Sequence, residues 1–335
     1  MINNNIIVKP VENVTFTGFL FKYFFMDRKK FIQNSSLLAL GSTLLPSIAT
    51  AEKEDSSSSS LDVVFISDVH VKPTDIAQEG MRKAFRVANK MKPDFIINGG
   101  DAIMDAMAAD KEKTTEQWQV WKKILNEENR LPIFHTIGNH DAWGWQLKDQ
   151  SVKNDPLYDK AWVIQEHNMP ERFYSFEKKN WKFIVLDTAH ENNGGYIAKI
   201  DEQQFAWLEG ELKNTPPDKH VCVVSHIPIV SFCSALFFDK NEPNGDWKIS
   251  RALLLTDARK MIDLFSGYQN IRCCLSGHIH LQDEVQYKNV QYFCNGATSG
   301  NWWNGAFKGF EPAFARFTFF KDGDVKRQMI NYGES

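Results

Sequence analysis

The chain has 335 residues, of which 43% are hydrophobic and 24% are charged, and its net charge is −3. This composition is typical of a globular protein with a large core. Without a basic excess, a bulk electrostatic hold on nucleic acid is not expected. The five cysteines form no CxxC motif, so a cysteine-type zinc site is not expected either. Four of them lie in apolar runs and are expected to be buried.

The N-terminal part has the pattern of an export signal. A basic patch at 28–30 precedes an apolar stretch, and Ala49-Thr50-Ala51 has the A-x-A form of a cleavage site. We therefore expect a signal peptide over residues 26–51, starting at about Met26 and cleaved after Ala51. Twin-arginine and Sec export both remain open, with the periplasm as the expected destination. The apolar stretch is too short to span a bilayer comfortably, so we expect no stable membrane insertion of the mature domain.

The sequence predicts three further regions. Residues 1–25 precede the expected start of the signal and are predicted to be a non-native upstream extension. Residues 52–60 are charged and rich in serine, which is typical of a flexible linker. Residues 61–335 are predicted to form one large domain.

Within residues 61–335, short apolar runs alternate with amphipathic stretches, and hairpin patterns accumulate toward the C-terminus. This order predicts an α/β protein with layered, mixed sheets. Residues 188–200 and 231–248 are expected to be loops over the site. Strands are expected at 61–67, 94–98, 133–137, 173–176, 181–186, 221–225, 271–275, 285–287, 290–293, 313–320 and 325–330, and helices at 76–91, 113–126, 201–213 and 252–265.

Polar blocks follow five of the predicted strands. They read DVH at 68–70, GGD at 99–101, GNHD at 138–141, a single histidine at 226 and GHIH at 277–280. Functional sites of α/β proteins assemble at the carboxyl ends of strands, so these blocks are expected to meet. Carboxylate and amide oxygens with imidazole nitrogens suit divalent Mn, Fe, Zn or Mg.

The spacing within the blocks adds two expectations about the backbone. On an extended backbone, the D-x-H and H-x-H spacings place alternate side chains on one face, so that each block supplies two ligands. The glycines before Asp101, Asn139 and His278 are expected to allow tight turns near the metals.

Taken in order, the five blocks resemble the signature of calcineurin-like metallophosphoesterases, and in particular of class III cyclic-nucleotide phosphodiesterases. The resemblance covers about residues 61–295. It implies a four-layer α/β/β/α sandwich with two mixed β-sheets, and a binuclear centre of two divalent metal ions at the strand ends.

The resemblance also implies roles for individual residues. His140 would be a catalytic imidazole that contacts a phosphate oxygen. Met104 stands where some relatives carry an aspartate that orients this histidine, so Asp141 or Asp105 is expected to substitute. The first metal would be held by Asp68, His70 and His280, the second by Asn139, His226 and His278, and Asp101 would bridge them.

The implied activity is hydrolysis of small phosphate esters, with phosphodiesters expected first. A hydroxide that bridges the two metals would attack phosphorus in line with the leaving oxygen. A phosphomonoesterase of the same fold and a non-catalytic, metal-containing binding module remain as alternatives. Because an export signal is expected, the substrate is not expected to be an intracellular second messenger.

Tryptophan pairs follow two of the metal-binding blocks and are candidates for substrate contact. Trp143 and Trp145 come directly after GNHD, and Trp302 and Trp303 follow the last block. Their rings could stack on a nucleobase or sugar, or could simply pack the loops against the sheet.

Overall fold

The computed structural model describes residues 60–238 and 242–333. The expected upstream extension, the expected signal peptide and all but the last residue of the expected linker lie outside the described residues. Among the helices that are described, none combines the length and the apolar character needed to cross a bilayer.

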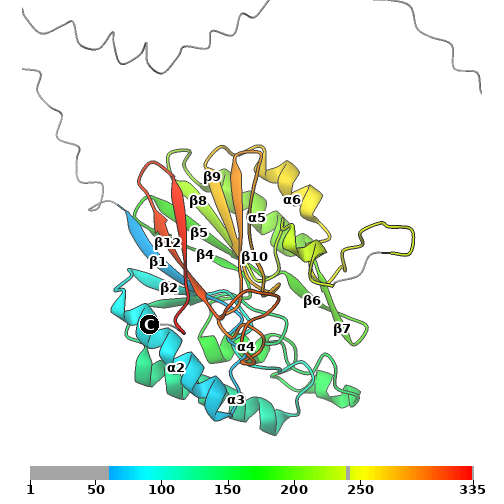
Figure 1. Cartoon of the computed structure of the whole chain (residues 1–335). Helices are drawn as coiled ribbons and strands as arrows, with labels where there is room; N and C mark the ends of the chain where they lie inside the picture. Colours follow the sequence, from blue (N-terminus) through cyan, green and yellow to red (C-terminus); the bar gives the residue numbers. More distant parts are fainter. Residues whose placement is uncertain (1–59, 239–241, 334–335) are drawn as a thin grey trace, which may run out of the picture. The chain divides into compact units, whose positions relative to one another are not determined.

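Two mixed sheets form the centre of the domain (Figure 1). The first has the order β13-β12-β1-β2-β3, with β1, β2 and β3 parallel to one another. The second has the order β10-β11-β9-β8-β5-β4, with β5, β8, β9 and β11 parallel. The strands are β1 (Leu61–Ile66), β2 (Phe95–Asn98), β3 (Ile133–His135), β4 (Tyr174–Lys178), β5 (Trp181–Leu186), β8 (His220–Ser225), β9 (Ile271–Ser276), β10 (Gln282–Tyr287), β11 (Val290–Asn295), β12 (Phe314–Phe319) and β13 (Val325–Ile330).

The alternation of apolar side chains along the strands sets the layers. In β1, Val63 and Phe65 belong to the cluster between the sheets, whereas Val64 and Ile66 belong to the cluster under the helices. Successive side chains of a strand point to opposite faces, so a strand that is apolar throughout is covered on both faces. Rings from both sheets meet in the middle; the centroids of Phe183 and Phe319 lie 5.3 Å apart.

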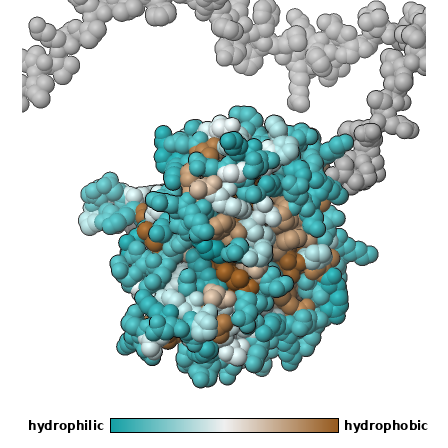
Figure 2. All heavy atoms as spheres, turned by 180° about the vertical axis from the view of Figure 1, so that it is seen from behind, coloured by the Kyte–Doolittle hydropathy of each residue, from teal (hydrophilic) through white to brown (hydrophobic). Residues whose placement is uncertain are grey.

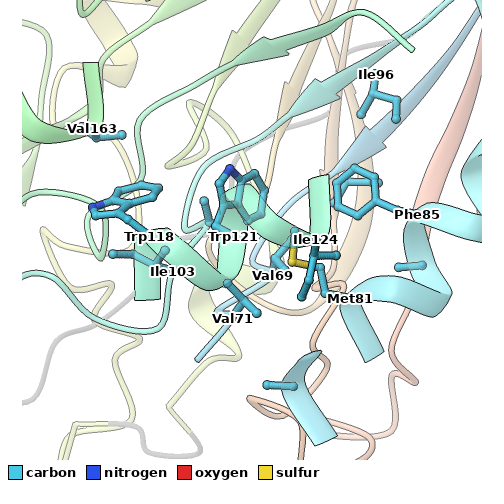
Figure 3. Close-up of a cluster of buried hydrophobic side chains, with 14 of the residues drawn as sticks. Val69, Val71, Met81, Phe85, Ile96, Ile103, Trp118, Trp121, Ile124 and Val163 are labelled. Carbon is cyan, nitrogen blue, oxygen red and sulfur yellow. The ribbon is translucent and has the colours of Figure 1, made fainter. Parts of the chain in front are cut away.

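Helices cover the outer face of each sheet. The first sheet packs against α2 (Asp75–Lys90) and α3 (Lys111–Glu128), whose Phe85, Trp118 and Trp121 lie in one buried cluster (Figure 3). The second packs against α5 (Glu202–Asn214) and α6 (Ala258–Phe265). The short helix α4 (Ala161–His167) and two 3₁₀ turns, η2 (Gln150–Asn154) and η3 (Cys233–Ala235), complete the set. The predicted four-layer α/β/β/α sandwich is therefore confirmed.

One face of the domain is mostly polar. On the face shown in Figure 2, hydrophilic residues predominate and apolar residues form small areas between them. All five cysteines are buried, as expected for those in apolar runs.

Two predicted elements were wrong. Residues 188–200 are not an irregular loop, because β6 (Ala189–Asn192) and β7 (Gly195–Ala198) form a separate antiparallel hairpin. The predicted helix at 252–265 is helical only in its second half, α6. The residues before it turn instead, and the backbone N–H of Leu255 donates to the carbonyl of Pro228, so tertiary contact overrides the local helical pattern.

A pair of buried histidines under α3 should make stability depend on pH. The rings of His135 and His167 stack with centroids 3.9 Å apart, and His167 also packs edge-on against Trp118 and Trp121. Burial lowers the pKa of His135 from 6.5 to about 3, and burial lowers the pKa of His167 strongly as well. The unfolded chain therefore binds more protons than the folded chain between these values, and stability falls as the pH drops below 6.5.

We predict that His167→Phe makes this decline shallower, by about 0.7 kcal/mol per pH unit at pH 6.5 and about 1.4 near pH 5, because one buried titrating group is removed. Urea unfolding of both proteins between pH 5 and pH 6.5 measures the slope of the unfolding free energy. An unchanged slope in the variant would contradict the prediction.

Candidate metal centre

The carboxyl ends of the parallel strands in both sheets converge on one place. Asp68 and His70 follow β1, Asp101 follows β2 and Asn139 follows β3, while His226 follows β8, and His278 and His280 follow β9. All of these side chains are buried. The predicted ligand residues are thus brought together, with ligands from the first sheet facing ligands from the second.

The first cluster consists of Asp68, His70 and His280, whose ligand atoms lie within 4.8 Å of one another. The Nε2 atoms of His70 and His280 are 3.1 Å apart, and Nε2 of His280 lies 3.4 Å from Oδ1 of Asp68. Separations of this size are expected between ligands of one ion bound at about 2.0–2.2 Å. The geometry therefore fits the first predicted metal position.

The second cluster consists of Asp101, His226 and His278. Nε2 of His226 lies 3.2 Å from Oδ2 of Asp101, 3.1 Å from Nδ1 of His278 and 3.2 Å from Oδ1 of Asn139. Oδ2 of Asp101 also lies 3.6 Å from Nε2 of His70 in the first cluster. Asp101 therefore stands between the two clusters, where a bridging ligand is required.

Backbone carbonyls fix which nitrogen faces the centre in three of the four ligand histidines. Nδ1 of His226 donates to the carbonyl of Gly99, Nδ1 of His280 to that of Gly300, and Nε2 of His278 to that of Ala252, at 2.7–2.9 Å. With those protons in place, Nε2 of His280 and Nδ1 of His278 are the nitrogens that face the centre. A carbonyl behind the ring is the usual way in which a metal-binding histidine is oriented, so the donor set fits divalent metal ions.

The charge states also suit metal binding. Burial lowers the pKa of His70 and of His278 to about 3, so both rings are neutral at physiological pH. Burial alone would raise the pKa of Asp68, but the hydrogen bond and charge of His280 outweigh it and hold the pKa at about 2. Burial alone would lower the pKa of His226, but the carboxylate of Asp101 outweighs it and raises the pKa to about 9, so this ring gives up a proton when a metal binds. Neutral imidazoles and ionised carboxylates are the forms that bind metals.

The backbone around the ligands differs from the extended form that we expected. Asp68, His70, Asp101, His278 and His280 all have positive φ, between 47° and 71°. Each therefore adopts a left-handed conformation that costs a residue with a side chain about 1–2 kcal/mol. The D-x-H and H-x-H blocks deliver two ligands each through these kinks and not through strand alternation.

The glycines of the motifs mainly allow the backbone to approach the ligand carboxylates closely, and they contribute less to turns than we expected. Of the three expected turn glycines, only Gly100 has a positive φ, at 95°. A Cβ on Gly138 would lie 2.1 Å from Oδ1 of Asp101, and one on Gly277 would lie 2.3 Å from Oδ2 of Asp68. Side chains at these positions would displace the metal-facing carboxylates.

Asp141 lies beneath the ligand loops and holds them together. It is fully buried. Its carboxylate accepts from the backbone N–H groups of Asp101, Ala102, Ile103 and Gly138 at 2.8–3.3 Å. We therefore assign Asp141 a positioning role, because its oxygens are occupied by the loop that carries the bridging ligand.

His140 lies at the edge of the centre, where its side chain is 24% exposed. Its ring packs edge-on against His70, with centroids 4.9 Å apart. Nδ1 lies 3.7 Å from Oδ1 of Asp105, so of the two carboxylates considered for orienting it, Asp105 is the one that faces the ring. Burial alone would lower the pKa of His140, but the carboxylates of Asp101, Asp105 and Asp141 outweigh it and raise the pKa to about 8.

The four candidate tryptophans have different surroundings. Trp143, Trp145 and Trp303 are at most 7% exposed. Their indole N–H groups donate to Ala109, to Asp159 and to the carbonyl of His70 respectively. Trp302 differs, because its ring is only partly buried and lies 4.4 Å from the ring of His280.

Tyr196 was missed by the sequence reasoning. It lies on β7, and its ring centroid is 5.9 Å from that of His278. No local signal marks it, because only the folding of the β6–β7 hairpin brings it to the second cluster. Trp302 and Tyr196 thus stand beside different metal clusters.

A four-layer sandwich with paired Asp/His clusters at its strand ends defines the class of metal-dependent phosphoesterases. Residues 61–282 match the model of the calcineurin-like phosphoesterases, and the chain belongs to this family.

Two curated relatives resemble the chain. A 3′,5′-cyclic-nucleotide phosphodiesterase of Nostoc sp. is 27% identical over 248 residues, which cover 71% of this chain and 78% of the relative. A manganese-dependent ADP-ribose/CDP-alcohol diphosphatase of Arabidopsis thaliana is 20% identical over 220 residues, which cover 56% of this chain and 64% of the relative.

Solved structures support the fold. A dimetal phosphatase from Danio rerio superimposes with a TM-score of 0.55 at 14% identity, covering 81% of this chain and 99% of the phosphatase. A purple acid phosphatase from yellow lupin gives a TM-score of 0.53 at 14% identity, covering 82% of this chain and 52% of the lupin protein.

We predict that His226→Ala lowers metal content by about one ion per chain, because the second cluster loses the nitrogen at its centre. Elemental analysis of the protein after dialysis measures the content. His220→Ala is the matched control, because His220 lies on β8 outside both clusters. Equal metal content in His226→Ala and the control would refute the assignment of His226.

Proposed function

We propose that the protein hydrolyses small phosphodiesters at this centre. The observation that carries the proposal is the complete ligand set beside a partly exposed, cationic His140. When bound, two divalent ions neutralise the charge of the phosphate and supply a hydroxide nucleophile at neutral pH. Export to the periplasm and action on substrates outside the cytoplasm are part of the same proposal, supported by the leader pattern at residues 26–51.

The protein's own residues prepare the site in two ways. The side chain of His140 is partly exposed at the edge of the centre, so a phosphate oxygen or the leaving oxygen can accept a hydrogen bond from its imidazolium. Two contacts set the position of His140. Its backbone N–H donates to Oδ1 of Asp101 at 2.8 Å, and its Nδ1 faces Asp105.

The charge of the site favours diesters over monoesters. Within the described residues, the cationic partners of Asp68, Asp101 and Asp105 are all histidines. A singly charged diester needs less compensating charge than a doubly charged monoester, so a site without lysine or arginine at these carboxylates suits the diester. The names of both curated relatives, a phosphodiesterase and a diphosphatase, support the same choice.

The alternatives predict different behaviour. A phosphomonoesterase would turn over mono-esters faster than diesters. A non-catalytic binding module would keep its metals and turn over neither. Against the second, each expected ligand and His140 are in place.

We predict Mn-stimulated turnover of bis-p-nitrophenyl phosphate that exceeds turnover of p-nitrophenyl phosphate. Asp101→Asn should abolish it, because the amide cannot bridge two cations as a carboxylate does. Release of p-nitrophenol measures both rates, with His220→Ala as the control that keeps wild-type activity. A higher rate on the monoester would replace the proposal with a phosphomonoesterase.

A second prediction concerns His140. His140→Asn should lower kcat about 10²–10⁴-fold, the range that general acid catalysis contributes, and should leave metal content unchanged. Asp105→Asn should act through the histidine, with a smaller loss and a pH profile displaced toward acid, because the carboxylate that helps to raise the pKa of His140 is gone. Steady-state kinetics between pH 5 and pH 9 test both variants. Wild-type kcat in His140→Asn would exclude a catalytic role.

A further inference from the structure

A second set of metal-binding side chains lies outside the Asp/His centre. Cys233, Asp283 and Cys294 place their ligand atoms within 4.8 Å of one another. They come from three elements: Cys233 begins η3, Asp283 lies on β10 and Cys294 on β11. The sequence showed no CxxC motif because folding, and not local spacing, brings these residues together.

Strand pairing fixes two of the three ligands. Asp283 and Cys294 are direct partners in the antiparallel pairing of β10 and β11. Cross-strand partners project their side chains on the same face with Cβ atoms about 4.5–5.5 Å apart. The third ligand is tied to the same carboxylate, since the backbone N–H of Cys233 donates to Oδ2 of Asp283 at 2.8 Å.

The two oxygens of Asp283 have different surroundings. Oδ2 accepts from Cys233 and from the hydroxyl of Ser231, at 2.8 and 3.0 Å. Oδ1 is buried and has no hydrogen-bond partner. A buried carboxylate oxygen without a donor is costly, and a cation beside the two thiols would satisfy it.

The charges balance with one divalent ion. One carboxylate and two thiolates carry three negative charges, which a divalent ion and a nearby guanidinium would offset together. Arg327 provides that guanidinium: its side chain is 13% exposed and donates to the carbonyls of Asp283 and Cys294 at 2.9 and 3.0 Å. Soft thiolate ligands select zinc among the common divalent ions.

We propose that Cys233, Asp283 and Cys294 form a structural zinc site, separate from the catalytic centre. An apolar shell of Leu253, Ile279 and Leu281 surrounds it, as expected of a closed structural site. The hydroxyl of Ser231, 3.1 Å from Sγ of Cys233, is positioned to complete the coordination or to hold the water that does so.

The position of the site gives the ion a role. Ile279 and Leu281, on either side of His280, pack in one buried cluster with Cys233 and Cys294. The zinc site would therefore support the loop of His278 and His280, which supplies a ligand to each catalytic cluster. It would also fix η3 and the segment after His226 to the β10–β11 hairpin.

Cobalt substitution tests the proposal without any assay of activity. The purified protein, reduced and freed of metal, is titrated with Co²⁺, and thiolate ligation produces a charge-transfer band in the near ultraviolet that oxygen and nitrogen ligands do not give. We expect this band in the wild-type protein, its loss in Cys294→Ala and in Cys233→Ala, and its retention in Cys274→Ala, another buried strand cysteine outside the cluster. We also expect zinc-loaded wild type to hold about one ion per chain more than Cys294→Ala.

Several results would overturn the proposal. Absence of the band in the wild-type protein would do so even if the variants fail to fold. Persistence of the band in Cys294→Ala would place the thiolate ligand elsewhere. A Cys233–Cys294 disulfide, found by peptide mapping of protein purified without reductant, would show a covalent cross-link in place of the metal. Each outcome is independent of phosphodiester turnover, so failure here and failure of the proposed function are distinguishable.

Discussion

The contact between the inner faces of the two sheets is the interaction on which the rest of the structure depends. Phe65, Phe183 and Phe319 lie with their neighbours in one buried layer between the sheets. Each metal cluster takes carboxylate from the first sheet and imidazole from the second. A shift of one sheet relative to the other would therefore separate the ligands of both clusters at once. Tight aromatic packing resists such a shift, because interiors are close-packed and deform little.

The centre concentrates strain and charge that the surrounding chain has to stabilise. Its ligands adopt left-handed backbone conformations and lie buried beside one another. Such conformations persist only where neighbouring structure determines them. Asp141 stabilises the ligand conformations because its carboxylate accepts hydrogen bonds from backbone N–H groups of the ligand loops. Gly138 and Gly277 stabilise them by leaving space for the ligand carboxylates. Bound cations would then offset the charge of the buried carboxylates.

The metal centre combines buried contacts that hold its ligands with partly exposed side chains that a substrate can reach. The proposed zinc site would hold the loop of His278 and His280 through the buried cluster that Ile279 and Leu281 share with Cys233 and Cys294. On the open side stand His140, Trp302 and Tyr196, each in contact with a ligand ring. The centre is thus fixed by buried contacts, and its partly exposed side chains are free to meet a substrate.

The sequence by itself predicted the layers and the candidate ligand set. Short apolar runs between amphipathic stretches predicted layered sheets, and the resemblance carried by the polar blocks implied the four-layer sandwich and the candidate residues from Asp68 to His280, because these signals are local along the chain. Tertiary structure decided what local patterns cannot contain. It placed Asp105 and not Asp141 toward His140, and it buried Trp143 and Trp145 while leaving Trp302 partly exposed beside His280. It also brought Tyr196 to His278, and it assembled the Cys233–Asp283–Cys294 set. These outcomes depend on contacts between residues far apart in the chain, which only the packed sheets and their loops create.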